Sequence, residues 1–169
     1  MSAAVATTIG QAMLPEPTLS RVEAAGVTDV GRLRSSNEDA FLIATLQRAI
    51  HVHDASPGAR GWFPGEPAGT LMIVADGMGG HGGGEVASST AVKSVTDHLL
   101  NTMPWVKVKT PTAARASSVG VRSELSTAIL ASEQTVRAEG ASNGMPNMGT
   151  TLTMAFLLCP FVYVAHVGD

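Results

Sequence analysis

The sequence has one cysteine, Cys159, and only 11 lysines and arginines among its 169 residues. A single cysteine excludes an internal disulfide and fits a reducing compartment. Because Cys159 lies in an apolar run, we expect it to be a buried core thiol. The sequence also lacks a basic run and carries a formal net charge of −3. These features give no electrostatic footprint for phosphate-backbone binding, so we expect no nucleic-acid partner.

The sequence also lacks a recognisable signal peptide and a long membrane span. Residues 1–17 contain no positive charge before the first acid and no long apolar stretch, so we predict a disordered leader at residues 1–20. The most apolar segment, residues 151–167, is broken by Pro160 and contains His166, which predicts two strands. We therefore expect a soluble, cytoplasmic protein that does not bind a membrane.

The remaining sequence, with 44% hydrophobic residues overall, is long enough for one domain with a core. Strands are predicted at residues 22–30 and 40–46, with a polar turn at residues 31–39. Residues 47–69 contain several prolines and glycines, which indicates a surface loop. The apolar run at residues 70–75, TLMIVA, predicts a fully buried strand.

Two helices and two more strands are expected in the second half. Apolar residues at helical spacing predict one helix from Glu85 through Leu99 and another from Val121 to near Gly140, packed as a pair. An irregular loop at residues 101–118 would connect them, and strands would follow at residues 148–156 and 163–169. This order predicts an α+β fold in which helices cover one side of antiparallel sheets.

The strongest chemical feature is VADGMGGHGGGE, in which Asp76 ends the apolar strand and a glycine-rich loop follows. An ionised carboxylate at such a position is costly without a positive partner, and a divalent cation is an efficient one. Because glycine has no Cβ, the carbonyl of Gly77 could approach the same ion. Carboxylate and carbonyl oxygens are the ligands that Mg²⁺ or Mn²⁺ prefers.

Two other interpretations of this motif remain open. Asp76 could cap the helix that follows a tight turn. Alternatively, Gly77, Gly79 and Gly82 fit the G-x-G-x-x-G fingerprint of dinucleotide-binding proteins. Asp76 counts against the second interpretation because it would direct negative charge at a pyrophosphate. The acid expected about 20 residues further on would be Asp97, inside the predicted helix.

A second cluster lies in GRLRSSNEDA, where Arg34 precedes Glu38 and Asp39. The guanidinium of arginine can hold two phosphate oxygens at once, and either carboxylate could reach a metal directly or through water. Asp169 ends the last predicted strand in the same way that Asp76 ends an earlier one. Strands ending in carboxylates that converge on one rim are what a multi-metal site requires.

These motifs, in order, resemble the bacterial branch of the PP2C-type, or PPM, phosphatases. The resemblance is carried by Arg34 with Asn37-Glu38-Asp39, by residues 74–81, by residues 148–151 and by residues 167–169. It implies an antiparallel β-sandwich flanked by helices in α-β-β-α layers. It also implies that residues 21–169 are the amino-terminal part of a phosphatase domain, truncated at the carboxyl end.

The resemblance implies roles for particular residues. Asp76 would bridge two Mn²⁺ or Mg²⁺ ions, the Gly77 carbonyl and Glu38 would support them, and Arg34 would hold the substrate phosphate. Asp169 would belong to a third, weaker metal site. The residues implied to be mainly structural are Asp39, His81, Gly149 and Thr150. A metal-activated water would then attack phosphorus in phosphoserine or phosphothreonine of protein substrates, which a serine/threonine kinase would have phosphorylated for signalling.

The chain departs from the family pattern in lacking the later D-G-x-x-D and D-N motifs, which supply further metal-binding aspartates. We therefore expect weak metal binding and weak or no activity from this chain alone. Met78 stands where eukaryotic relatives often carry a histidine, so no general acid is assigned. The alternative function is a non-catalytic module that binds phosphoproteins. In either case we expect a monomer.

Overall fold

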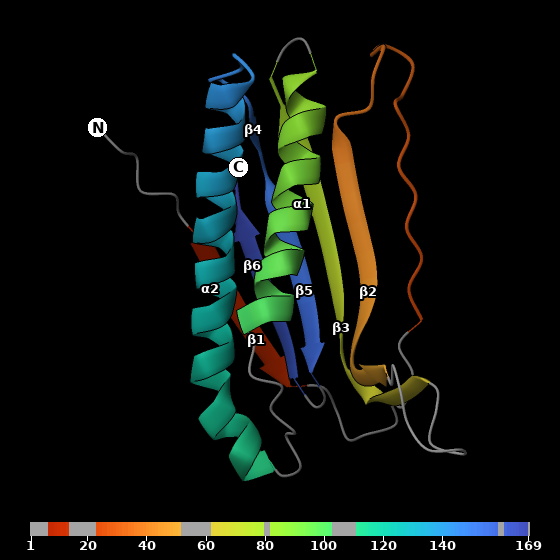
Figure 1. The fold of residues 1–169 in the computed structure, drawn as a ribbon, viewed down its shortest axis with the longest axis vertical. Coiled ribbons are helices and arrows are strands. Elements are labelled where there is room, and N and C mark those ends of the chain that lie inside the picture. Colours follow the sequence, from red (N-terminus) through yellow and green to blue (C-terminus); the bar gives the residue numbers. More distant parts are fainter. Residues whose placement is uncertain are drawn as a thin grey trace.

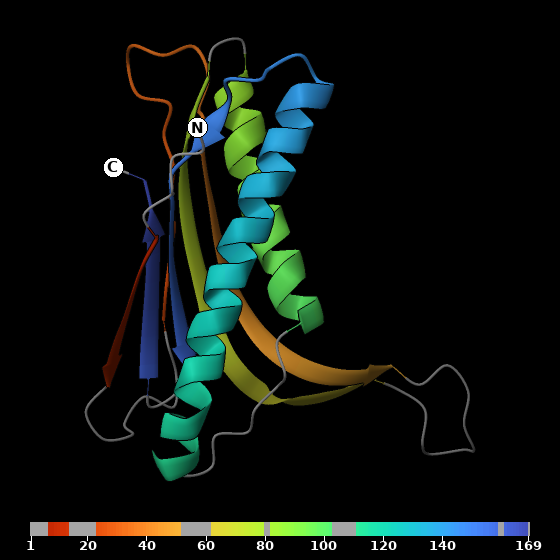
Figure 2. The same ribbon diagram turned by 90° about the vertical axis from the view of Figure 1, so that its left-hand side faces the viewer.

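The computed structural model describes residues 7–13, 23–51, 62–79, 82–102, 111–158 and 161–168. In these parts of the chain, two helices lie side by side across one face of an antiparallel sheet (Figures 1 and 2). This arrangement confirms the predicted α+β class. The elements, in chain order, are β1 (Thr7–Met13), β2 (Asp39–His51), β3 (Trp62–Met78), α1 (Gly83–Thr102), α2 (Pro111–Ser142), β4 (Gly149–Thr150), β5 (Leu152–Leu158) and β6 (Phe161–Val167).

The sheet has the order β1-β6-β5-β3-β2, and the short strand β4 pairs with the end of β3. Side chains alternate between the two faces, so Leu71, Ile73 and Ala75 are buried beneath the helices while Val74 is 57% exposed on the other face. The strand predicted at residues 70–75 is thus confirmed, but the prediction that it is fully buried is wrong. It is buried on one face only, because the described helices cover only that face.

Strands β2 and β3 are longer than the sequence predicted. Residues 47–51 continue β2 and residues 62–69 begin β3, so the predicted loop at residues 47–69 is wrong at both ends, while residues 52–61 lie outside the described parts. The pairing contains register shifts between Leu46 and Gln47 and between Gln47 and Ala49. Such irregularities bend strands. The end of β2 that follows the shifts and the paired beginning of β3 curve towards the helix side (Figure 2).

The helices contribute the core expected from their periodicity. Each buries apolar residues three or four positions apart, including Ala91, Val95 and Leu99 of α1 and Leu125 and Ile129 of α2. Their pairing is confirmed by a hydrogen bond from Ser132 Oγ on α2 to the Ala91 carbonyl on α1, at 3.4 Å. The predicted loop at residues 101–118 is too long, since α2 begins at Pro111. Proline suits a first helical position because no intrahelical bond needs its amide.

Two predictions for the amino-terminal part are wrong. Residues 7–13 of the predicted disordered leader form β1, which pairs with β6 along its whole length. The predicted strand at residues 22–30 is not formed by residues 23–30, which are exposed and have no ladder partner. This segment is instead fixed by local contacts, such as the 2.6 Å hydrogen bond from Asn37 Nδ2 to Thr28 Oγ1.

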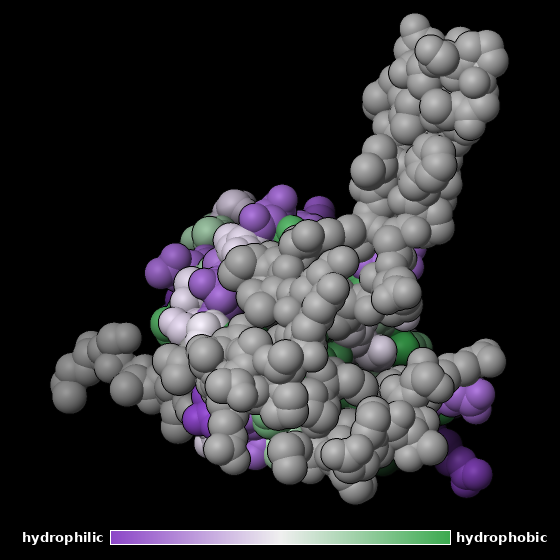
Figure 3. Space-filling model, turned by 90° about the horizontal axis from the view of Figure 1, so that it is seen from below, coloured by the Kyte–Doolittle hydropathy of each residue, from purple (hydrophilic) through white to green (hydrophobic). Residues whose placement is uncertain are grey.

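The surface of the described residues differs between regions. On the sheet face opposite the helices, Phe41, Ile43, Val74 and Val164 are each at least 37% exposed, and we call these four residues the open-face patch. Seen from the lower end of Figure 1, the coloured residues show hydrophilic and hydrophobic positions side by side (Figure 3). Of the helices described, none is long and apolar enough to cross a membrane.

Candidate functional site

The candidate site lies where β3 and β6 end. Strand β5 is antiparallel to both, so β3 and β6 run in the same direction and finish at the same edge of the sheet. This confirms the prediction that these two strand ends converge on one rim. Asp76 lies near the end of β3 at this rim, whereas Asp169, which follows β6, lies outside the described residues, as does His81.

Asp39 and Asp76 are directly opposite each other on β2 and β3. Both residues are exposed, and residues opposite each other in a sheet direct their side chains to the same face. Two like charges in this position repel each other unless a cation or a donor lies between them. From the residues alone, Glu38 or Asp39 could reach a metal, and the family resemblance implied a mainly structural part for Asp39. Its position opposite Asp76 was not predicted, because it depends on a strand register that local sequence does not reveal.

The main chain of Asp76 is held by two threonines, Thr150 at the end of β4 and Thr151 directly after it. Thr150 Oγ1 donates a hydrogen bond to the Asp76 carbonyl at 2.9 Å, and the Thr151 amide donates to the same oxygen at 2.9 Å. The Asp76 amide in turn donates to Thr151 Oγ1 at 3.2 Å. These bonds fix the end of β3, which fits the structural part predicted for Thr150 and adds Thr151.

Glu38 lies between β3 and the beginning of α1. Its carbonyl accepts a 3.1 Å hydrogen bond from the Gly77 amide. A Cβ on Gly84 would lie only 2.6 Å from the Glu38 carboxyl carbon, so the carboxylate packs directly against the helix. Sequence reasoning did not single out Gly84. Its signal was the glycine run at residues 82–84, because a close backbone approach requires a residue without a side chain.

Arg34 is beside Glu38 at the same rim. Its Nη1 lies 3.3 Å from Glu38 Oε2, and the two side chains are 63% and 18% exposed, respectively. The pair is therefore a surface ion pair in which the arginine remains open to solvent. A guanidinium in this position could exchange part of its contact with Glu38 for the oxygens of an incoming phosphate.

Both alternative interpretations of the glycine motif fail. Asp76 does not cap α1, since the helix begins at Gly83, and the capping contacts there come from backbone groups such as the Gly79 carbonyl, which accepts from the Gly84 amide at 3.2 Å. The dinucleotide fingerprint requires a parallel βαβ unit. β3 pairs antiparallel with β2, β4 and β5, so this requirement is not met.

The donor atoms at this edge fit a hard divalent cation in type. Asp76, Asp39 and Glu38 offer carboxylate oxygens, which Mg²⁺ and Mn²⁺ prefer. However, within the described ranges no three histidine, cysteine, aspartate or glutamate side chains form a group that could hold a metal ion. The described side chains of these types therefore do not by themselves form a metal-binding group.

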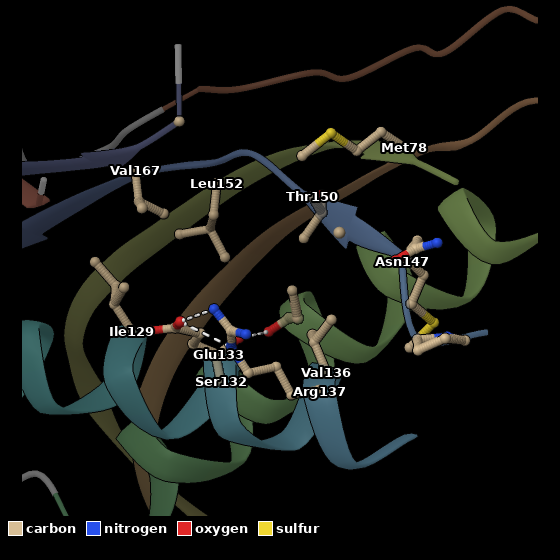
Figure 4. Close-up of a pocket in the computed structure, with 15 residues that line it drawn as sticks. Met78, Ile129, Ser132, Glu133, Val136, Arg137, Asn147, Thr150, Leu152 and Val167 are labelled. Atoms are coloured by element: carbon tan, nitrogen blue, oxygen red, sulfur yellow. Dashed lines mark hydrogen bonds and ion pairs between the residues drawn. The ribbon is translucent and has the colours of Figure 1, made fainter. Parts of the chain in front are cut away.

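A pocket of about 500 Å³ lies on the helix side of this edge (Figure 4). Its walls come from α2, from the segment between α2 and β4, and from β4 to β6, with Met78 of β3 and Ala91 of α1 also lining it. The apolar residues include Ile129, Val136 and Leu152. Arg137 and Glu133 form an ion pair there, with Arg137 Nη2 at 2.7 Å from Glu133 Oε1. Asp76 and Asp39 do not line the pocket, so it is a separate feature that shares Thr150 with the candidate site.

Comparison with known proteins finds the same family along most of the chain. Residues 51–169 match the family model described as protein phosphatase 2C. A serine/threonine phosphatase, stp, from Listeria welshimeri is 30% identical over 142 residues, which are 84% of this chain and 45% of that protein. The chain therefore spans about half the length of the curated relatives it matches.

Solved structures agree on the fold. A serine/threonine phosphatase from S. agalactiae has a TM-score of 0.53 at 22% identity, over 97% of this chain and 49% of that one. The catalytic domain of the serine/threonine protein phosphatase PstP, solved in complex with two manganese ions, has a TM-score of 0.52 at 20% identity, over 98% of this chain and 50% of that one. At these identities the likeness concerns the fold.

Proposed function

Because this chain belongs to the protein phosphatase 2C family, we propose that the whole protein hydrolyses phosphoserine and phosphothreonine in proteins. The observation that carries the proposal is the facing pair Asp39 and Asp76 at the end of β3, with Glu38 and Arg34 beside it. Two facing carboxylates repel each other, and no cationic partner between them is described. Their arrangement is therefore better explained by binding of a divalent cation than by a purely structural role in the sheet.

The residues of this edge would divide the work. Asp76, the Gly77 carbonyl and Glu38 would hold the metal, with Asp39 adding charge from the neighbouring strand. Arg34, whose side chain is 63% exposed, would bind and orient the substrate phosphate. Thr150 and Thr151 would keep Asp76 in place through the bonds to its carbonyl. Asp169 would belong to a third, weaker metal site, and His81 would help to order the glycine loop.

The ions we infer are Mn²⁺ or Mg²⁺, two of them in the complete site, in line with the two manganese ions bound to the structurally similar PstP domain. When bound, such ions supply a water molecule of lowered pKa that can act as the nucleophile. This chain alone is expected to bind metal weakly, because its described carboxylates do not by themselves form a metal-binding group.

The substrates would be proteins phosphorylated by a serine/threonine kinase, so the enzyme would act in phosphorylation signalling. The stp and PhpP phosphatases that the chain matches are bacterial proteins. We further propose that the protein is cytoplasmic and that its folded form is a monomer at low concentration. Neither a nucleic acid nor a membrane is proposed as a partner.

Hydrolysis of a phosphothreonine peptide tests this function. Two proteins would be assayed in the presence of Mn²⁺: the chain by itself, and a fusion in which the remaining half of the Listeria welshimeri relative follows Asp169. We expect hydrolysis by the fusion and little or none by the chain alone, with Asp76→Asn abolishing activity and Asp97→Asn, an exposed position on α1, preserving it. A folded fusion that binds the phosphopeptide without hydrolysing it would instead support the non-catalytic binding module.

A further inference from the structure

Strand β1 occupies one edge of the sheet. It pairs antiparallel with β6 in continuous register, from Thr7 opposite Val167 to Met13 opposite Phe161. Its neighbour β6 is well buried on the helix side, where Phe161, Tyr163 and Ala165 are at most 6% exposed. Without β1, a strand of sequence FVYVAHV would present unpaired main-chain groups at the edge, and such an apolar edge readily pairs with another strand.

The attachment of β1 itself is shallow. Of residues 8–12, none is buried, and Ile9 packs against the core as a partly buried residue. One side-chain hydrogen bond reaches the helical layer, from Arg122 Nη2 to Gln11 Oε1 at 2.6 Å. Gly10 and Ala12 also give the strand a low intrinsic preference for β structure. Main-chain pairing therefore dominates its attachment, and a short exposed edge strand opens at low cost in free energy.

The order of the strands separates β1 from the element that follows it in the chain. β1 and β2 are the two outermost strands, at opposite edges of the sheet. The chain after β1 must therefore pass to the far edge, as the colours in Figure 1 show. No tight hairpin ties β1 to β6 or to any strand beside it. The same pairs could thus form with a β1 segment that belongs to another molecule.

From these observations we propose that the β6 edge is a strand-addition site and that its partner is the β1 segment of a second copy of this chain. In a monomer the site is filled by the molecule's own β1. At higher concentration two copies exchange β1 segments and form a dimer that makes the same register and the same Gln11–Arg122 bond across the two molecules. The proposal does not depend on the phosphatase activity.

Engineered cysteines at paired positions test the exchange. Gly10 lies opposite Val164, a Cβ at Gly10 would meet no atom within 4 Å, and Val164 is 43% exposed, so both positions accept a side chain. Full-length chains with Cys159→Ser would carry either Gly10→Cys or Val164→Cys, the second with an affinity tag. After mixing at high concentration and mild oxidation, β1 of one copy lying on β6 of the other would bring the two cysteines together and favour a disulfide between the two chains.

The matched control replaces Val164→Cys with Val162→Cys. Val162 lies opposite Ala12, two residues away in the register, which places its Cα beyond the roughly 7 Å that a disulfide spans. The matched pair should give about five times as much disulfide-linked heterodimer as the control, or more. An excess of a peptide of sequence TTIGQAM should suppress formation of this heterodimer. Light scattering should show dimer growing with concentration. Equal cross-linking by both pairs, or a mass that stays monomeric, would overturn the proposal.

Discussion

Gly84 lies where α1 begins, and its missing side chain lets the Glu38 carboxylate pack against the helix. The same close approach holds at Gly77, where a Cβ would be 2.6 Å from the Glu38 carbonyl oxygen. These two glycines therefore set the distance between the end of β3, the Glu38 turn and the helix. Any side chain there must move Glu38, which is one of the proposed metal-binding residues.

Alanine substitution separates this packing effect from helix propensity. Gly84→Ala should lower the free energy of unfolding by about 1–3 kcal/mol, because the new methyl group overlaps Glu38. The matched control is Gly120→Ala in α2, where a Cβ meets nothing within 4 Å and where alanine should raise stability by roughly 0.5–1 kcal/mol. Urea unfolding followed by circular dichroism measures both. Equal effects at the two positions would refute the role given to Gly84.

A second residue-scale prediction concerns Tyr163 in β6. Burial raises the pKa of its hydroxyl above 10.0, and Arg122 lowers it by a smaller amount. The unfolded chain therefore loses this proton at a lower pH than the folded chain, so the contribution to stability is complete below pH 10 and is lost as the pH rises further. Tyr163→Phe should flatten the fall in unfolding free energy as the pH rises above about 10. Parallel curves for the two proteins would contradict the assignment.

Residue identities at the site could be predicted from the sequence more completely than their contacts. Asp76, Gly77, Glu38 and Arg34 were identified because a carboxylate after an apolar strand and an arginine near acids are local patterns. The position of Asp39 opposite Asp76 was not predicted, since it follows from the long-range pairing of β2 with β3. The contact between Gly84 and Glu38 was missed for the same reason.

Among the elements, the helices depend most on one-sided burial. Leu125 of α2 is fully buried in the hydrophobic core, whereas Leu130 of the same helix is 52% exposed. The difference comes from helical periodicity, which directs the two side chains to different faces. The same periodicity predicted both helices from the sequence.

This asymmetry gives a prediction for one substitution at two positions. Leu125→Ala should lower the free energy of unfolding by about 2–5 kcal/mol, because it removes buried apolar contacts and leaves a cavity. Leu130→Ala should change it by no more than about 0.5 kcal/mol, as expected for a surface position. The midpoint of urea denaturation reports both changes. Similar losses at the two sites would mean that α2 packs in a different rotation.

Elements were harder to predict where pairing overrides local composition. Residues 7–13 contain glycine and alanine and read as a leader, yet β6 pairs with them as β1. Residues 62–69 contain prolines and glycines and read as a loop, yet they belong to β3. Residues 23–30 have the composition of a strand but form no strand in the described structure. In each case the neighbouring strand, which the local sequence does not specify, decides the outcome.

For the whole molecule, the main feature is the sheet face that the helices leave bare, with the open-face patch of Phe41, Ile43, Val74 and Val164. The structure describes one helical layer and one sheet, which are two of the four layers expected from the sequence. The chain also spans only 45% of its Listeria welshimeri relative. An apolar face of this kind is a surface on which other elements or molecules can pack.

A hydrophobic dye measures how accessible this face is in solution. The double substitution Ile43→Lys with Val74→Lys should reduce the fluorescence of bound anilinonaphthalene sulfonate by about twofold or more, because it places charges on the patch. The matched control, Leu100→Lys with Leu130→Lys, alters two exposed leucines on the helices and should leave the signal almost unchanged. A larger loss in the control would show that the dye binds the helical face instead.

Mn²⁺ binding measured by electron paramagnetic resonance tests most directly the proposal that the edge formed by Asp76, Asp39 and Glu38 holds a divalent cation. The full chain should bind Mn²⁺ weakly, and Asp76→Asn should reduce the affinity about tenfold, or roughly 1.4 kcal/mol. Asp97→Asn, in an exposed position on α1, should leave binding unchanged. Equal Mn²⁺ binding by the unmodified chain and by Asp76→Asn would contradict the claim.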